Sequence, residues 1–276
     1  MNIQSMFTNS DAWSKTAKGY LKLSQNITLK HGVKTIEITG LKSAIEDQKN
    51  LRILDIACGT GDLGIEIARL ATENKTDLFI TSTDFAEEMI NLAKENSIQY
   101  KDLNECLVME GNNLKFEDST FDFTYSMFGV FFFPERKKAM KEIYRTLKKG
   151  GKAGITFWKD FPHAMKETME EFGMDKGHGS HGDINNEELI VADLKESGFE
   201  KVEIVKNETE SFFENFDDLF NGAISNPGIL GLLSKLSEEE KDRFLSLYKK
   251  HMLNKFSKDG KSATISTCGM IAVASK

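Results

Sequence analysis

A glycine-rich stretch that follows an apolar run carries the residues with the clearest chemical potential in this sequence. In the segment LRILDIACGTGDLG, Asp55 lies within the apolar run, and Gly59, Gly61 and Gly64 form the pattern G-x-G-x-x-G. Asp84 follows twenty residues after Gly64. Glycines at this spacing let a backbone approach a nucleotide-like cofactor closely, and an acid at this distance is placed to bind ribose hydroxyls. The stretch therefore predicts a site for a ribose-containing cofactor.

Asp55 separates two interpretations of this stretch. A dinucleotide-binding strand aims a helix N-terminus at a pyrophosphate and needs no carboxylate of its own. A buried ionised carboxylate is costly without partners, and a cofactor with ammonium and sulfonium charges would supply the opposite charge. Asp55 followed by Gly59-Thr60-Gly61 suits this second kind of cofactor. An NAD(P)-dependent oxidoreductase that uses the same glycines is the alternative interpretation.

Short apolar, β-branched runs alternate with helical patterns along the chain. This alternation predicts an α/β fold with a mostly parallel sheet and helices on both faces. In the helix expected after Asp84, apolar residues such as Met89 and Ala93 share one stripe. The predicted strands are residues 51–57, 78–83, 105–109, 121–126, 152–157, 201–205 and 267–274.

Two helical segments lie outside the alternating pattern, one at the start of the chain and one late in it. They either cover the carboxyl edge of the sheet, where open α/β folds bind ligands, or serve as plain packing helices. The sequence leaves both interpretations open. We predict a single domain over residues 1–276, with an N-terminal helical cap at 1–48, a cofactor-binding core at 49–158, and the remaining sheet at 159–276 with a helical insertion at 212–256.

The composition is that of an ordinary globular protein. The 276 residues include 39% hydrophobic and 29% charged residues, with a net charge of −7. This negative charge argues against a nucleic-acid partner, which needs a basic face. No apolar run approaches the ~20 residues of a membrane span, and MNIQSMFTNSDAW lacks the regions of a signal peptide. The three scattered cysteines indicate reduced thiols, so we expect a cytoplasmic protein.

Four successive motifs resemble one protein family. LDIACGTGD resembles motif I of class I S-adenosylmethionine-dependent methyltransferases, and TSTDFAEEMINLAKEN resembles their second strand, its terminal acid and the next helix. EGNNLKFEDSTFDFTYSMFGVFFFPE and AMKEIYRTLKKGGKAGITFW resemble later parts of the same core. The resemblance covers residues 11–275 and is nearest to the small-molecule, ubiquinone/menaquinone-type enzymes. It implies a Rossmann-like, seven-stranded, mostly parallel sheet, S-adenosylmethionine as cofactor, and a small-molecule methyl acceptor.

The resemblance also implies roles for individual residues. Asp84 would hold the two ribose hydroxyls, and Phe85 and Met89 would lie against the adenine. Family members commonly carry an acid at the position of Asn112, where an amide can still pair with the adenine edge. The full set of cofactor-binding residues that the resemblance implies is Tyr20, Asp55, Ala57, Gly59, Gly61, Asp84, Phe85, Met89, Asn112, Asn113 and Ser126.

No constellation of catalytic residues stands out, so the catalytic residues stay unassigned. Methyl transfer from a sulfonium chiefly needs donor and acceptor to be positioned, and a base is needed only when the nucleophile arrives protonated. His163, His178 and His181 are candidates for such a base. The H-x-x-H spacing of the last two has no further ligands nearby, which favours a glycine-rich loop over a metal site.

Acceptor choice must come from the segments added to the cofactor-binding core. We predict a mostly apolar acceptor pocket, roofed by the N-terminal helices with Trp13 and Tyr20 and by the insertion 212–256. Phe128 and residues 131–133 would form its floor. A cofactor-binding but catalytically silent subunit and a nucleic-acid methyltransferase are further alternatives.

Overall fold

The computed structural model describes residues 7–47, 50–174 and 186–276. Within these ranges, seven strands form one sheet in the order β3-β2-β1-β4-β5-β7-β6. Neighbouring strands are parallel except around β7, which runs antiparallel to β5 and β6. The mostly parallel α/β sheet that the alternation predicts is confirmed. The strands are β1 (Leu51–Ile56), β2 (Leu78–Asp84), β3 (Asn104–Val108), β4 (Phe121–Met127), β5 (Leu147–Asp160), β6 (Lys201–Phe213) and β7 (Ala263–Ser275).

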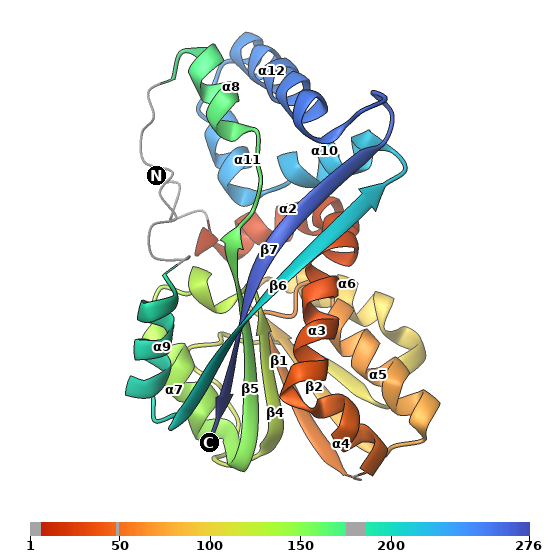
Figure 1. Cartoon of the computed structure of the whole chain (residues 1–276), viewed down its shortest axis with the longest axis vertical. Helices are drawn as coiled ribbons and strands as arrows, with labels where there is room; N and C mark the ends of the chain where they lie inside the picture. Colours follow the sequence, from red (N-terminus) through yellow and green to blue (C-terminus); the bar gives the residue numbers. More distant parts are fainter. Residues whose placement is uncertain (1–6, 48–49, 175–185) are drawn as a thin grey trace.

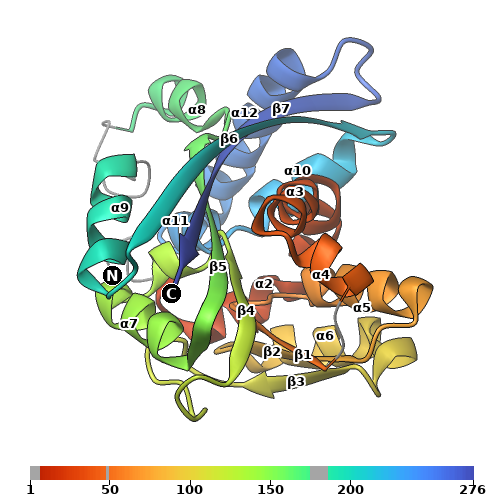
Figure 2. The same cartoon turned by 60° about the horizontal axis from the view of Figure 1, so that its bottom comes forward.

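Helices cover both faces of the sheet (Figure 2). Successive side chains of a strand point to opposite faces, so a strand with apolar residues at successive positions needs helices on both sides. On β1, Ile53 packs with apolar residues of α3, α4 and α5, whereas Leu54 packs with those of α7 and α9. Both side chains are fully buried. These helices are α3 (Leu29–Thr39), α4 (Leu41–Asp47), α5 (Asp62–Asn74), α7 (Arg136–Thr146) and α9 (Glu187–Glu196), and α6 (Glu87–Asn96) packs along β3.

The last two strands form a long ribbon that rises from the sheet to a separate group of helices (Figure 1). We call this group the helical lobe. Apolar residues of the ribbon's upper end, including Phe213 and Ile265, belong to its core. The helical lobe consists of α8 (Met165–Phe172), α10 (Phe216–Ile224), α11 (Pro227–Leu233) and α12 (Glu238–Phe256).

Both ribbon strands are longer than the sequence predicts. Each has 13 residues, and β6 continues to Phe213, so the helical insertion begins at Phe216 rather than at residue 212. Residues 206–211 of β6 read KNETES, a polar run that is typical of a turn. In the ribbon, exposed residues such as Glu208 and Glu210 alternate with less exposed ones, which is why polar residues suit a strand there.

The N-terminal helices are α2 (Ser10–Leu23), the π-helix η1 (Ser24–Thr28), α3 and α4. Of these, α2 lies between the sheet and the helical lobe, whereas α3 and α4 pack along one face of the sheet (Figure 1). α2 crosses α10 in close contact, since a Cβ atom at Gly19 would lie 1.9 Å from Ser225 Oγ. Lys22 Nζ also lies 2.7 Å from Asp218 Oδ1 at this crossing. On α3, the fully buried His31 lies 2.9 Å from Asn207 Nδ2 on β6, through its Nδ1.

Candidate active site

A cavity of about 780 Å³ lies at the carboxyl ends of the parallel strands. Its wall combines residues after β1, at the ends of β2, β4 and β5, from the N-terminal helices and from the helical lobe. This volume is typical of a small-molecule site, and its position at the carboxyl edge is where open α/β sheets bind ligands. Six of the sequence-predicted site residues line it: Tyr20, Ala57, Gly59, Asp84, Phe85 and Met89.

Asp84 joins the end of β2 to the glycine loop. It is 6% exposed, and its Oδ2 accepts the backbone N–H of Gly59 at 3.0 Å. Its Oδ1 accepts the backbone N–H of Ala86 at 2.9 Å. Burial raises the pKa of Asp84 to about 6, against the opposite effect of these backbone hydrogen bonds. Each carboxylate oxygen has a second lone pair, so Asp84 can still accept hydrogen bonds from a ligand in the cavity.

The loop after β1 has left-handed backbone at Ala57, Gly59 and Gly61, with φ of 58°, 55° and 86°. Gly61 also provides space, because a Cβ there would lie 3.0 Å from the Cβ of Ala93 on α6. Ala57 adopts this conformation without being glycine, and such strain is concentrated at functional sites. Gly61 therefore serves helix packing, whereas Ala57 and Gly59 form the cavity wall.

Asp55 lies on β1 behind this loop and is 1% exposed. Neither of its carboxylate oxygens has a hydrogen-bond partner in the part of the chain that the structure describes. Burial, followed by the charges of Asp84 and Asp62, raises the pKa of Asp55 well above its ordinary value. Asp62 Oδ2 in turn accepts the hydroxyls of Ser24 and Thr60, both at 2.7 Å. A positively charged ligand beside these carboxylates would offset their repulsion, which fits a sulfonium cofactor.

Aromatic side chains from the N-terminal helices close the acidic end of the cavity. The Trp13 ring meets Tyr20 edge-on, with centroids 5.8 Å apart, and tilts against Phe132 at 5.9 Å. Burial, then Asp62 and Asp84, raises the pKa of Tyr20 to about 12, so this phenol lies close to both carboxylates and stays protonated. The structure thus places Trp13 and Tyr20 over the end where the cofactor is expected.

A second aromatic group forms the wall beyond β4 and β5. The rings of Phe128 and Trp158 stack with centroids 3.8 Å apart, and Phe161 meets Trp158 edge-on at 4.8 Å. Behind them, the buried His31 ring stands perpendicular to both stacked rings, and burial lowers its pKa to about 4. Sequence reasoning missed Trp158 and Phe161, although ITFWKDF places aromatics at the end of a predicted strand. The helical lobe adds Met165, Met169, Leu232, Tyr248, Met252 and Phe256 to the wall.

The loop after β3 differs from the sequence expectation. Glu110 and Gly111 line the cavity, whereas Asn112 and Asn113 do not. Gly111 permits this arrangement because a Cβ there would lie 2.3 Å from Cε2 of Phe133, which is also part of the wall. After Gly111 the loop turns away, and Asn113 is exposed. The two residues of this loop on the cavity wall are thus two positions earlier in the chain than Asn112 and Asn113.

Three other residues singled out from the sequence occupy different surroundings, and two lie outside the described residues. Ser126 is fully buried, and its hydroxyl has no partner among the residues that the structure describes. Phe131 packs in the sheet core and not on the cavity wall. His163 lines the cavity. His178 and His181 lie outside the described residues.

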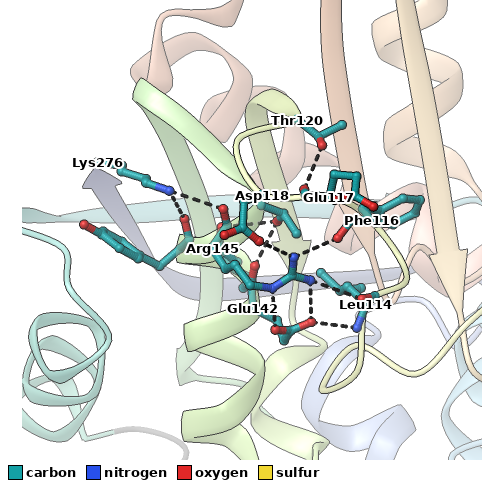
Figure 3. A network of polar contacts seen from close by, with 11 residues as sticks. Leu114, Phe116, Glu117, Asp118, Thr120, Glu142, Arg145 and Lys276 are labelled. Atoms are coloured by element: carbon teal, nitrogen blue, oxygen red, sulfur yellow. Dashed lines mark hydrogen bonds and ion pairs between the residues drawn. The ribbon is translucent and has the colours of Figure 1, made fainter.

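A hydrogen-bond network holds the loop after β3 against α7 (Figure 3). Arg145 donates to the backbone carbonyls of Leu114 at 3.1 Å and Phe116 at 2.7 Å, and pairs with Asp118 at 2.7 Å. Glu142 binds the same guanidinium and accepts the N–H of Leu114 at 2.9 Å. The hydrogen bond with Arg145 lowers the pKa of Glu142. This network fixes the loop whose first residues line the cavity.

Over the residues the structure describes, no group of three or more His, Cys, Asp or Glu side chains is placed to hold a metal ion. In the same ranges, no helix is long and apolar enough to cross a membrane.

Comparison with known proteins identifies the family. Residues 10–173, more than half of the chain, match the ubiE/COQ5 methyltransferase family. The chain belongs to this family. Among curated relatives, the ubiquinone/menaquinone biosynthesis C-methyltransferase UbiE of Rickettsia prowazekii is 38% identical over 108 residues, which cover 37% of this chain and 42% of that protein. The UbiE of Rickettsia typhi matches with the same identity and coverage. The match therefore spans less than half the length of these relatives.

Solved structures share the fold of this ubiE/COQ5 family member. A putative methyltransferase from Bacillus halodurans C-125 superposes with a TM-score of 0.52 at 18% identity, over 86% of this chain and 98% of that one. A putative sarcosine dimethylglycine methyltransferase from Galdieria sulphuraria gives 0.52 at 17% identity, over 89% and 85%. The [4+2]-cyclase SpnF gives 0.52 at 17% identity, over 87% and 80%. The seven-stranded Rossmann-like fold is thus shown, and the fold alone does not define the reaction.

Proposed function

We propose that the protein transfers a methyl group from S-adenosylmethionine to a small organic acceptor. The observation that carries this proposal is the joining of two environments in one cavity: the acidic end with Asp84 and the glycine loop, and the aromatic wall with Phe128 and Trp158. The first suits a cofactor with ribose and positive charge, and the second suits an apolar acceptor. Membership of the ubiE/COQ5 methyltransferase family supports the same reaction.

The positions of the lining residues support a role for each in binding the cofactor. Asp84 would accept the ribose hydroxyls, with Phe85 and Met89 against the adenine, because all three line the cavity beside the end of β2. Glu110 and the backbone of Gly111 would meet the adenine edge in place of Asn112 and Asn113. Ala57 and Gly59 would surround the methionine part, Asp55 and Asp62 would supply negative charge behind them, and Tyr20 would close over the site.

When bound, S-adenosylmethionine supplies a methyl group on a sulfonium, which leaves as S-adenosylhomocysteine while the sulfur keeps the electron pair of the broken bond. The chain's own residues then need chiefly to hold the acceptor atom in line and to exclude water, and such positioning can contribute up to ~7–11 kcal/mol. The aromatic wall and the roof of N-terminal helices serve both tasks. Of the sequence-predicted bases within the described residues, His163 lines the cavity and stays the candidate for an acceptor that must lose a proton.

A small-molecule acceptor fits this cavity better than a nucleic acid. No Lys or Arg side chain is among the described residues that form its wall. A nucleic-acid site needs cations that pair with phosphates. An acceptor without negative charge is therefore expected.

Calorimetry tests the proposal directly. S-adenosylmethionine and S-adenosylhomocysteine should bind in the micromolar range, and NADH should not bind. Binding of NADH alone would overturn the methyltransferase function in favour of an oxidoreductase that uses the same glycines. If S-adenosylmethionine binds, mass spectrometry of any small molecule that co-purifies with the protein would identify a candidate acceptor.

A further inference from the structure

One phenol in the helical-lobe part of the cavity has no protein partner. Tyr248 on α12 lines the cavity and is 3% exposed. Its hydroxyl forms no hydrogen bond with any residue that the structure describes. The hydroxyl is not fully enclosed by protein atoms, although the residue as a whole is buried. Since Tyr248 lines the cavity, the cavity is where its hydroxyl can meet a ligand.

The surroundings of Tyr248 hold its ring in place and are apolar. Its ring lies 6.1 Å from that of Phe220 and 6.3 Å from that of Phe244, measured between centroids. One and two turns further along α12, Met252 and Phe256 continue the same wall. The hydroxyl is thus a fixed polar group in an apolar environment, where a group without a hydrogen bond costs free energy. A phenylalanine would satisfy the packing here, so the hydroxyl serves something other than the packing.

We propose that Tyr248 is a specificity-determining residue, whose hydroxyl donates a hydrogen bond to an oxygen or nitrogen atom of the methyl acceptor. The proposal rests on the proposed function, because the ligand in this part of the cavity is then the acceptor. Tyr248 lies away from the cofactor end: burial alone raises its pKa to about 12, whereas Asp62 and Asp84 contribute to the pKa of Tyr20. With this pKa the hydroxyl is a donor at neutral pH and not a base.

A pair of probes of matched shape isolates the hydrogen bond. 2-Acetylnaphthalene has a carbonyl group at the position of the methylene group of 2-ethylnaphthalene. Both molecules are otherwise apolar and similar in shape. Their dissociation constants are measured by equilibrium dialysis against the full chain saturated with S-adenosylhomocysteine. We call the ratio of the acetyl-probe affinity to the ethyl-probe affinity the acetyl preference. Tyr248→Phe should lower this preference about 2- to 12-fold relative to the unaltered protein, the range of one neutral hydrogen bond, and should leave the affinity for the ethyl probe unchanged.

A matched control and a second measurement separate the possible outcomes. Tyr144→Phe, outside the cavity wall, should keep the preference. The proposal is overturned if Tyr248→Phe keeps the preference of the unaltered protein, if both probes weaken equally, or if the unaltered protein binds neither probe. The affinity for S-adenosylhomocysteine is measured on the same samples and should not change in Tyr248→Phe. If the unaltered protein fails to bind S-adenosylhomocysteine, the proposed function fails; the probe preference is then measured without it and still shows whether the Tyr248 hydroxyl donates a hydrogen bond to a ligand in this cavity.

Discussion

At the scale of single residues, the main feature of the candidate site is its buried carboxylates. No Lys or Arg among the described residues of the cavity wall offsets their charge. Asp84 is held by two backbone N–H groups, and Asp55 has no partner within the described chain. Burying such groups lowers the stability of the ligand-free protein, and only a ligand that compensates them makes the arrangement favourable. We therefore propose that the site is preorganised for a cationic, ribose-containing ligand at the expense of stability.

Asp84→Ala should weaken the binding of S-adenosylhomocysteine at least tenfold, a loss of ~1.4 kcal/mol. The variant loses charge-assisted hydrogen bonds to the ribose, and it also frees the N–H of Gly59 that fixes the glycine loop. Calorimetry on the folded variant measures the change. Asp102→Ala, at an exposed acid near β3, is the control and should bind normally. Normal binding by Asp84→Ala would show that the cofactor site lies elsewhere.

Asp55→Asn should make the ligand-free protein less sensitive to rising pH. An unfolded Asp ionises near 3.8, whereas the pKa of folded Asp55 is raised well above this value. Between these two pKa values the folded state binds more protons, so the free energy of unfolding falls as the pH rises. The Tm of the unaltered protein should therefore drop more between pH 5 and pH 8 than that of Asp55→Asn. Asp102→Asn should behave as the unaltered protein does, and equal drops in all three would contradict the assignment.

At the scale of elements, the crossing of α2 and α10 determines how the roof fits the cavity. Gly19→Ala should push the two helices apart, because the new Cβ would lie 1.9 Å from Ser225 Oγ. We expect a lower Tm and weaker binding of S-adenosylhomocysteine, since Tyr20 is on the same helix. The double variant Gly19→Ala/Ser225→Gly removes the opposing side chain and should recover most of both losses. Equal defects in the single and double variants would show that the crossing is not tightly packed.

The N-terminal helices should act as a lid over the cofactor. Trp13 and Tyr20 line the cavity, so a ligand enclosed beneath them stabilises α2 against local opening. We expect S-adenosylhomocysteine to slow amide hydrogen exchange within residues 11–31. The amides of α9, whose residues are not part of the cavity wall, serve as the internal reference. Unchanged exchange throughout residues 11–31 would exclude the lid.

At the scale of the whole molecule, the β6–β7 ribbon joins the sheet to the helical lobe (Figure 1). Its lower residues pair within the sheet, and its upper residues pack in the core of the lobe. We therefore propose that both parts form one domain and should unfold in one transition, with equal calorimetric and van 't Hoff enthalpies. S-adenosylhomocysteine at 100 times its dissociation constant should add ~2.7 kcal/mol to the stability of this single unit. Two transitions in a calorimetric scan, with only one shifted by the ligand, would contradict this unity.

The sequence by itself determines the local parts of the site. The glycine loop at residues 57–61 and the acid that ends β2 are recognisable because turn conformation and strand–helix alternation depend on near neighbours in the chain. The mostly parallel sheet follows from the same alternation. For this reason Ala57, Gly59 and Asp84 are found on the cavity wall as expected.

Only the tertiary structure decides the shape of the cavity and which side chains reach it. Trp158 and Tyr248 belong to segments far apart in the chain, and they share one wall because the helical lobe lies beyond the carboxyl ends of the strands. Asn112 misses the wall because Arg145, 33 positions away, fixes the path of its loop. The length of the ribbon strands also depends on tertiary contacts. The polar residues of β6 extend the strand because they pair with β7, and their side chains stay on an exposed face. Each outcome depends on contacts between distant segments, and no local pattern of residue types encodes such contacts.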